Sequence, residues 1–331
     1  MSKPFAVLIS DIHFNVNALL WASSSLRQAL NRATNLDIPL IIAGDLNDTK
    51  AIIRGEVANV IIEILSRASV KVFILVGNHD LLSEKTKESG LDYLKPYATI
   101  INKATKFTDN VTLLPYYNDS AEISNILSAE PAGNTVIMHQ GFRGAMMGDY
   151  IQDKTSIDPK LASHLRVFSG HYHRHQTIGT ITYIGSPYTI TFGEANDGPK
   201  GFLVLNEDGT YEQIPTNLRK HVIIEGAGDD EGFSVDWDKI HSIGTSDLIW
   251  VKLRGSQSNL AKIDKIQLGN FLFNHSNYKL DLIPTDSTVN DVTLIDKTNE
   301  EIFDSIIDSL SDPKAHKDYL KTLYRSIICN S

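Results

Sequence analysis

Five short clusters of Asp, Asn, His and Gly recur along the first half of the chain, and each directly follows an apolar run. The clusters lie at residues 11–13, 44–48, 77–80, 138–141 and 170–173. Apolar runs that alternate with helix-like segments are typical of an α/β layered fold. In such folds the loops just past the carboxyl ends of the strands carry the chemistry. The sequence therefore predicts that these five clusters meet at one site.

The spacing of apolar residues predicts the elements around these clusters. We expect strands at 5–10, 40–43, 70–76, 111–115, 135–138 and 167–169, and helices at 16–35 and 52–68. From residue 180 the pattern changes to hairpins. Apolar runs at 202–205 and 210–214 flank an Asp208-Gly209 pair, which is a strong turn signal.

The pattern also divides the chain into four segments. We expect a first domain at 1–218, a small α/β domain at 219–283, a linker at 284–297 and a helical segment at 298–331. Within the small domain, 248–254 alternates like a half-buried strand and 259–273 is helical. The last segment predicts two amphipathic helices. They either pack on their own domain or dock a partner.

Charge and cysteine content narrow the class of protein. The formal net charge of −9 gives no global attraction for polyanions, so nucleic-acid binding would need a local basic surface or bound metal. Cys329 is the single cysteine, which excludes a disulfide within the chain. The N-terminus lacks a signal-peptide pattern, and no apolar stretch reaches the length of a membrane helix. We expect a cytoplasmic protein that does not enter membranes.

The side chains of the five clusters are suited to divalent metals. Their oxygen and nitrogen donors fit manganese, iron or zinc in a catalytic role. None of the five contains cysteine, which argues against a structural zinc site. Each motif alone is weak evidence, because a lone Asp-x-His or Gly-Asp is usually a polar loop or a turn. The five together, in order and each at a strand end, indicate a metal site.

In combination, the clusters resemble those of the calcineurin-like metallophosphoesterases over roughly residues 5–192. The resemblance implies a layered β-sandwich flanked by helices, with a small α/β capping domain and C-terminal helices. It implies one metal held by Asp11, His13, Asp45 and His173, and a second held by Asp45, Asn78, His139 and His171. His79 and Asp80 would be the catalytic residues, with His79 facing the phosphate. Asp48 and His175 would support these groups without binding metal.

Segments at 183–188, 192–197 and 200–202 resemble the SbcD or Mre-type branch, and among its members bacteriophage recombination nucleases. That resemblance implies two Mn²⁺ ions, with Mg²⁺ as the alternative. It implies 3′–5′ exonuclease activity on double-stranded DNA and endonuclease activity on single strands, in recombination, repair and replication. The expected partners are DNA, a second copy of the chain, and an SbcC or Rad-type coiled-coil ATPase gripped by the terminal helices. Phe14, Asn15 and Asn47 depart from the usual pattern of the branch.

Two other functions are open at this point. One is a phosphodiesterase for small molecules such as cyclic nucleotides, which the same metal ligands would serve. The other is a non-catalytic scaffold for an ATPase, against which the complete ligand set argues.

Overall fold

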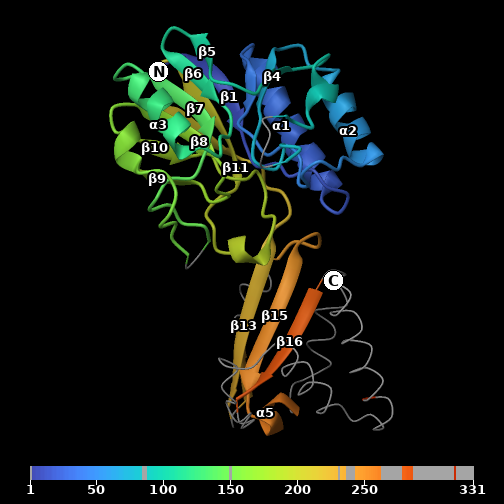
Figure 1. The fold of residues 1–331 in the computed structure, drawn as a ribbon. Helices are drawn as coiled ribbons and strands as arrows, with labels where there is room; N and C mark the ends of the chain where they lie inside the picture. Colours follow the sequence, from blue (N-terminus) through green and yellow to red (C-terminus); the bar gives the residue numbers. More distant parts are fainter. Residues whose placement is uncertain are drawn as a thin grey trace. The chain divides into compact units, whose positions relative to one another are not determined.

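The computed structural model describes residues 2–83, 88–148, 151–229, 232–235, 243–261, 278–285 and 317 (Figure 1). Contacts divide the chain into two units, and all residues up to Gly226 belong to the first. The domain boundaries at 218, 283 and 297 stay predictions. Among the described residues, we find no helix with the length and apolar character that crossing a membrane requires.

The first unit contains two six-stranded sheets. In one sheet the order is β12-β11-β1-β2-β3-β4, and the run β1-β2-β3-β4 is parallel. Its strands are β1 (Pro4–Ile9), β2 (Leu40–Ile42), β3 (Val72–Leu75), β4 (Thr99–Ile101), β11 (Gly201–Asn206) and β12 (Tyr211–Pro215). The predicted hairpin is confirmed as the antiparallel pair of β11 and β12.

The other sheet has the order β5-β6-β7-β8-β10-β9, with a parallel run from β6 through β7 and β8 to β10. Its strands are β5 (Thr105–Thr108), β6 (Val111–Leu114), β7 (Thr135–His139), β8 (Arg166–Gly170), β9 (Gln176–Ile178) and β10 (Ile181–Tyr183). Because β2, β3, β7 and β8 all lie inside parallel runs, each brings a following loop to the same end of its sheet.

The two sheets pack face to face through one apolar layer. Leu8 and Ile41 from the first sheet share this layer with Ile137 and Phe168 from the second, and all four are buried. Alternate residues of the same strands, such as Val7 on β1, point to the opposite face. The strands therefore appear in the sequence as continuous apolar runs, because both of their faces are covered.

Helices cover the outer faces of the sandwich (Figure 1). The helices α1 (Leu19–Leu36) and α2 (Gly55–Leu65) share an apolar cluster with β1, β2 and β3. On the other side, α3 (Ser120–Ala129) packs with β7 and β8. The first unit also contains three short 3₁₀ turns, which are η1 (Asp92–Leu94), η2 (Pro159–Ala162) and η3 (Phe192–Glu194). The predicted β-sandwich flanked by helices is confirmed.

The helix boundaries differ from those expected. The helix predicted at 16–35 begins at Leu19, because Asn15 Oδ1 accepts a hydrogen bond from the Ala18 backbone N–H at 2.9 Å and forms a turn first. The helix predicted at 52–68 spans only Gly55–Leu65 and follows an extended Arg54. The helix α3 was not predicted. It begins where Asp119 Oδ1 accepts from the Ala121 backbone N–H at 2.8 Å.

A four-stranded sheet of order β14-β13-β15-β16 follows in the chain. It consists of β13 (His221–Asp229), β14 (Gly232–Val235), β15 (Leu248–Gly255) and β16 (Tyr278–Pro284). The strand expected at 248–254 is confirmed by β15. The short helix α5 (Gln257–Ala261) lies at the start of the helix expected at 259–273, whose remainder is outside the described residues. The segment predicted to form the terminal helices, except for residue 317, and most of the linker also lie outside them.

Sheet packing generates the first testable prediction. Leu8 is fully buried between the sheets, whereas Leu20 is 67% exposed on α1. We expect Leu8→Ala to lower the free energy of unfolding by ~2–5 kcal/mol, through lost burial and the cavity that remains. Leu20→Ala, the control, should change it by less than ~0.5 kcal/mol. Urea unfolding followed by circular dichroism measures both, and equal effects would contradict the assigned core.

Candidate metal centre

The five polar clusters all follow strands of the two sheets. Asp11 and His13 come after β1, Asp45 after β2, and Asn78 after β3. From the second sheet, His139 is the last residue of β7, and residues 171–173 follow β8. Backbone hydrogen bonds join the first two loops, from Asp11 N to Gly44 O and from His13 N to Asp45 O, both at 3.1 Å. The predicted clusters therefore belong to one site.

The backbone at this site adopts a rare conformation. Asp11, His13, Asp45 and His171 all have positive φ angles, of 52°, 48°, 50° and 88°. Non-glycine residues seldom enter this left-handed region, and each instance costs of order 1 kcal/mol or more. Such strain gathers at functional sites, where the surrounding structure enforces it.

Seven predicted metal ligands come together at this site. Asp45 Oδ2 lies 3.2 Å from His139 Nε2 and 3.8 Å from His13 Nε2. Asn78 Oδ1 lies 3.1 Å from His139 Nε2 and 2.9 Å from His171 Nδ1. Asp45 therefore lies between two groups of nitrogen donors, the position that a bridging ligand requires.

The remaining ligands lie on the His13 side. His13 Nε2 and His173 Nε2 are 3.1 Å apart. Asp11 belongs to two groups whose ligand atoms all lie within 4.8 Å of one another, one with His13 and His173 and the other with Asp45 and His139. Its carboxylate also accepts a hydrogen bond from the His171 backbone N–H at 3.0 Å. Asp11 thus lies close to ligands of both sets that the family resemblance implies, and the division of the seven residues into two sets stays a prediction.

Hydrogen bonds fix the protonation of two of the histidine rings. His139 Nδ1 donates to the Ala43 carbonyl at 2.8 Å, and His173 Nδ1 donates to Glu194 Oε1 at 2.9 Å. Because both partners only accept, each Nδ1 carries a proton, and the Nε2 atom of each ring faces the other ligands. This is the arrangement of metal-binding histidines, and the side chains present fit divalent cations.

Burial and charge shape the acidity of the ligands. Burial opposes the charge on Asp45, yet His139 beside it holds the pKa of the Asp45 carboxyl well below its usual value. Burial and the charge of His139 lower the pKa of His171 to about 4. At neutral pH Asp45 is therefore an ionised carboxylate and His171 a neutral imidazole, the forms that coordinate metals. Against the effect of burial, the carboxylates of Asp45 and Asp11 raise the pKa of His139 to about 9, so a metal that binds there displaces a proton from this ring.

His79 lies beside the ligands without being one of the seven. Its backbone N–H donates to Asp45 Oδ1 at 2.8 Å, and its ring Nδ1 donates to the Asp48 carbonyl at 2.6 Å. Asp48 also contacts the ligand His13, with 3.3 Å between Oδ1 and Nδ1. Asp48 therefore orients both a ligand and the predicted catalytic histidine.

Asp80 was expected to act in catalysis and His175 to support the metal centre, and the side-chain hydrogen bonds of both residues are with the backbone of neighbouring segments. Asp80 is 2% exposed and accepts hydrogen bonds from the backbone N–H groups of Gly77 at 2.9 Å and Asn47 at 3.0 Å. It ties together the loops that carry Asp45 and Asn78. Its location is therefore suited to holding these loops in position rather than to contacting a substrate. His175 donates from Nδ1 to the Tyr183 carbonyl at 2.8 Å and supports β10.

Comparison with known proteins places this geometry in a family. The sequence model described as Calcineurin-like phosphoesterase matches residues 6–175, a span that contains all five clusters. The chain belongs to the calcineurin-like phosphoesterase family. Members of this family are metal-dependent hydrolases of phosphoesters, and the Asp and His clusters of this chain have ligand atoms close enough together to hold a metal ion. The predicted family is confirmed.

The chain is also similar to two individual proteins. Exonuclease subunit 1 of Enterobacteria phage T4 is 26% identical over 191 residues, which are 54% of this chain and 56% of that protein. The chain thus matches only about half the length of this relative. A solved nuclease, MPE of Pseudomonas putida, aligns over 52% of this chain and 64% of its own, with a TM-score of 0.30 and 15% identity.

Two residues of this phosphoesterase site were not predicted to be part of it. Glu194 lies in η3 and accepts from the ring of His173, and Tyr116 stacks on His171 with ring centroids 5.9 Å apart. Neither belongs to a ligand cluster, and both reach the site through tertiary packing. The only sequence signal was the place of Glu194 in a segment that resembles one branch of the family.

Close packing of Gly77 against Asp45 generates a second prediction. A Cβ atom added at Gly77 would overlap the carboxylate and the backbone nitrogen of Asp45. We expect Gly77→Ala to cost ~1–3 kcal/mol of stability by overpacking, and to weaken Mn²⁺ binding ~10-fold or more by displacing Asp45. Melting curves and calorimetric titration with Mn²⁺ measure the two effects.

Gly55 provides the matched control for this substitution. A Cβ atom at Gly55, the first residue of α2, meets nothing within 4 Å. Gly55→Ala should therefore leave Mn²⁺ binding unchanged. A Gly77→Ala protein that titrates like Gly55→Ala would contradict the assigned position of Asp45.

Proposed function

We propose that this phosphoesterase is a DNA nuclease that hydrolyses phosphodiester bonds with two divalent metal ions. The observation that supports it best is the convergence of one further carboxylate, one amide and four histidines around the carboxylate of Asp45. The ions are Mn²⁺ in this proposal, with Mg²⁺ as the alternative. The reactions are 3′–5′ exonuclease cleavage of double-stranded DNA and endonuclease cleavage of single strands.

The chemistry follows from the residues of the centre. Asp11, His13, Asp45 and His173 would hold one ion, and Asp45, Asn78, His139 and His171 the other. Such ions supply a hydroxide nucleophile near neutral pH and neutralise charge on the phosphate. The ligands themselves stay fixed, because each is hydrogen-bonded or packed by a neighbouring loop.

His79 acts on the substrate in this proposal. The Asp48 carbonyl accepts from Nδ1 and so sets the direction of the ring, which leaves Nε2 as the atom available to substrate. A protonated ring donates from Nε2 to a phosphate oxygen or to the leaving oxygen. A general acid placed in this way is worth about 10²–10⁴-fold in rate.

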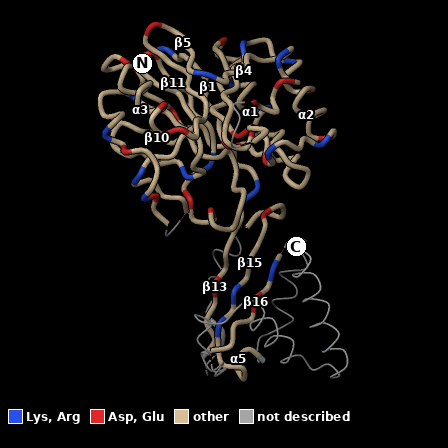
Figure 2. Tube along the Cα trace, viewed as in Figure 1, with Lys and Arg blue, Asp and Glu red and all other residues tan. Residues whose placement is uncertain are grey.

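The phage relative supports the choice of DNA, and the charge pattern neither favours nor excludes it. Figure 2 shows Lys and Arg interspersed with Asp and Glu along the described trace. On such a surface, attraction for a nucleic-acid backbone depends on local sites and on bound cations. The phage relative is by its name an exonuclease subunit, which supports both a nuclease activity and an assembly with other chains.

The assembly that we propose has two copies of this chain and an SbcC or Rad-type coiled-coil ATPase. The segment at 298–331, of which the structure describes only residue 317, would bind that ATPase, and the domain at 219–283 would cap the DNA. The complex would act in recombination, repair and replication in the cytoplasm, where one cysteine suits a reducing environment.

Removing the bridging charge should disable the centre. We expect Asp45→Asn to weaken Mn²⁺ binding by at least ~100-fold and to abolish cleavage, because both ions would share this carboxylate. The control is Asp37→Asn. Asp37 has the same left-handed backbone, with φ of 52° against 50° at Asp45, but it terminates α1. Mn²⁺ titration and a nuclease assay are carried out on both variants. An active Asp45→Asn protein would contradict the proposed role of Asp45 as the ligand shared by both ions.

Removing His79 should separate binding from catalysis. We expect His79→Ala to keep Mn²⁺ affinity, because the hydrogen bond to Asp45 comes from the backbone, and to lose about 10²–10⁴-fold in cleavage rate. His164→Ala is the control, because His164 is not one of the seven predicted ligands and its ring contacts the Glu130 carbonyl at 3.1 Å. Retained cleavage in His79→Ala would refute the role in catalysis.

The substrate class is tested on the wild-type chain with Mn²⁺, with and without a coiled-coil ATPase. Linear duplex DNA, single-stranded DNA and a chromogenic phosphodiester are offered in parallel. Degradation of DNA supports the proposal. Cleavage of the chromogenic ester with intact DNA in every case would favour a small-molecule phosphodiesterase. Stable binding of the ATPase without uptake of Mn²⁺ would favour a scaffold.

A further inference from the structure

We propose that Glu194 is a positioning residue that fixes the His173 imidazole as a metal ligand, and that Lys200 and Asp197 hold Glu194 in place. The inference rests on the proposed metal centre and names a residue outside its ligand set. It starts from a buried carboxylate in η3, a 3₁₀ turn that follows β10 in the chain.

The Glu194 carboxylate faces two different partners. Oε1 accepts from His173 Nδ1 at 2.9 Å, and Oε2 accepts from Lys200 Nζ at 2.8 Å. Oε2 also accepts from the Ile190 backbone N–H at 3.2 Å. The residue is 6% exposed. Burying a carboxylate is unfavourable unless charged and hydrogen-bonding partners compensate it, and here both oxygens have such partners.

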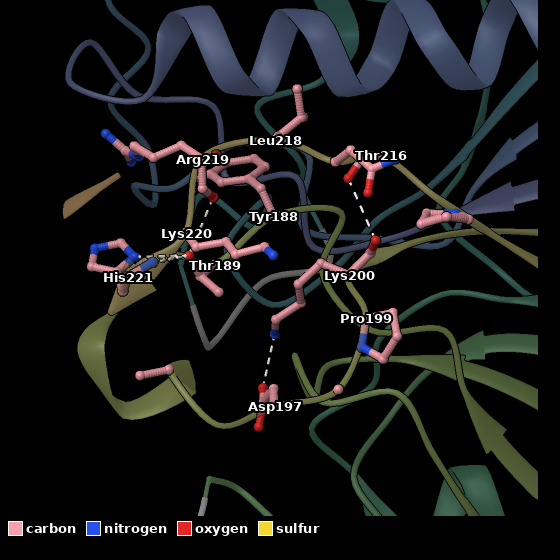
Figure 3. Close-up of a pocket in the computed structure, with 14 residues that line it drawn as sticks. Tyr188, Thr189, Asp197, Pro199, Lys200, Thr216, Leu218, Arg219, Lys220 and His221 are labelled. Carbon is pink, nitrogen blue, oxygen red and sulfur yellow. Dashed lines mark hydrogen bonds and ion pairs between the residues drawn. The ribbon is translucent and has the colours of Figure 1, made fainter. Parts of the chain in front are cut away.

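Lys200 contacts both the carboxylate that supports the His173 ring and the backbone of His173 itself. Its Nζ lies 2.8 Å from Glu194 Oε2, 2.8 Å from Asp197 Oδ2 and 2.8 Å from the carbonyl oxygen of His173. Figure 3 shows Lys200 extending toward Asp197 along the wall of a pocket. One ammonium group therefore holds the main chain of His173 and also the carboxylate that contacts its ring.

These contacts fix the rotation of the His173 ring. With Nδ1 donating to Glu194, Nε2 faces His13 Nε2 at 3.1 Å and carries the free lone pair. A carboxylate behind a ligating histidine fixes its orientation and makes the opposite nitrogen more basic. His139 on the other side of the centre uses the Ala43 carbonyl instead, which no side-chain substitution removes. The support of His173 is thus open to a mutational test.

Two substitutions separate the contributions of charge and hydrogen bond. Glu194→Gln keeps an oxygen acceptor for His173 Nδ1 and loses the charge, whereas Glu194→Met loses both. We expect calorimetric titration of the full chain with Mn²⁺ to show weakened binding at one of two sites. The loss should be about 10-fold for Glu194→Gln and about 100-fold for Glu194→Met.

Glu130 offers a matched control elsewhere in the first unit. It is 9% exposed and accepts from Lys106 Nζ at 2.6 Å, Thr112 Oγ1 at 2.7 Å and Asn134 Nδ2 at 3.1 Å. It is thus a buried carboxylate paired with a lysine, but it supports no metal ligand. Glu130→Gln and Glu130→Met should lower the melting temperature and leave both Mn²⁺ affinities unchanged.

The outcomes distinguish this inference from the metal centre itself. If wild type binds two Mn²⁺ ions and both Glu194 variants bind them equally well, the inference is refuted, whatever their melting temperatures. If wild type binds no Mn²⁺, the centre fails and the inference fails with it. Should Glu194→Met not fold, the Glu194→Gln titration against Glu130→Gln decides alone.

Discussion

A buried negative charge at Asp45 is the constraint around which this site is arranged. A carboxylate that is 2% exposed is tolerated only where the surrounding groups compensate it. Here the compensation comes from the His139 ring and the His79 backbone N–H. Gly77 leaves the space that this carboxylate occupies, and Asp80 below ties the neighbouring loops through their backbone N–H groups. The site therefore depends on groups that never touch a substrate.

Sheet architecture explains how residues far apart in the sequence reach this carboxylate. Parallel strands inside each sheet deliver their loops to the same end, and the apolar layer between the sheets holds the two ends together. Three loops come from the first sheet and two from the second. A change that shifted one sheet against the other would separate Asp45 from His139, so the apolar layer and the polar centre belong to one structural unit.

Local pattern predicted the strands and the five polar clusters, whereas the sandwich and the seven candidate ligands came from the family resemblance that those clusters carry. Apolar runs mark strands that are covered on both faces, and the polar cluster after each run marks the loop. The sequence did not predict α3, whose apolar pattern is interrupted by polar residues and whose start depends on the Asp119 cap. Nor did it predict the contact of Glu194 with His173, or the position of Asp80 beneath the loops. Those contacts arise between segments that only tertiary packing brings together.

The left-handed backbone at Asp11, His13, Asp45 and His171 has an evolutionary consequence. Asp, Asn and His enter this conformation several times more often than other non-glycine residues, and Asp and His are also good donors to divalent cations. Glu offers the same carboxylate and lacks that tolerance. Coordination chemistry and main-chain sterics therefore select the same few amino acids at these positions. We expect drift here to run among Asp, Asn, His and Gly, and an exchange of Asp for Glu to be among the least acceptable.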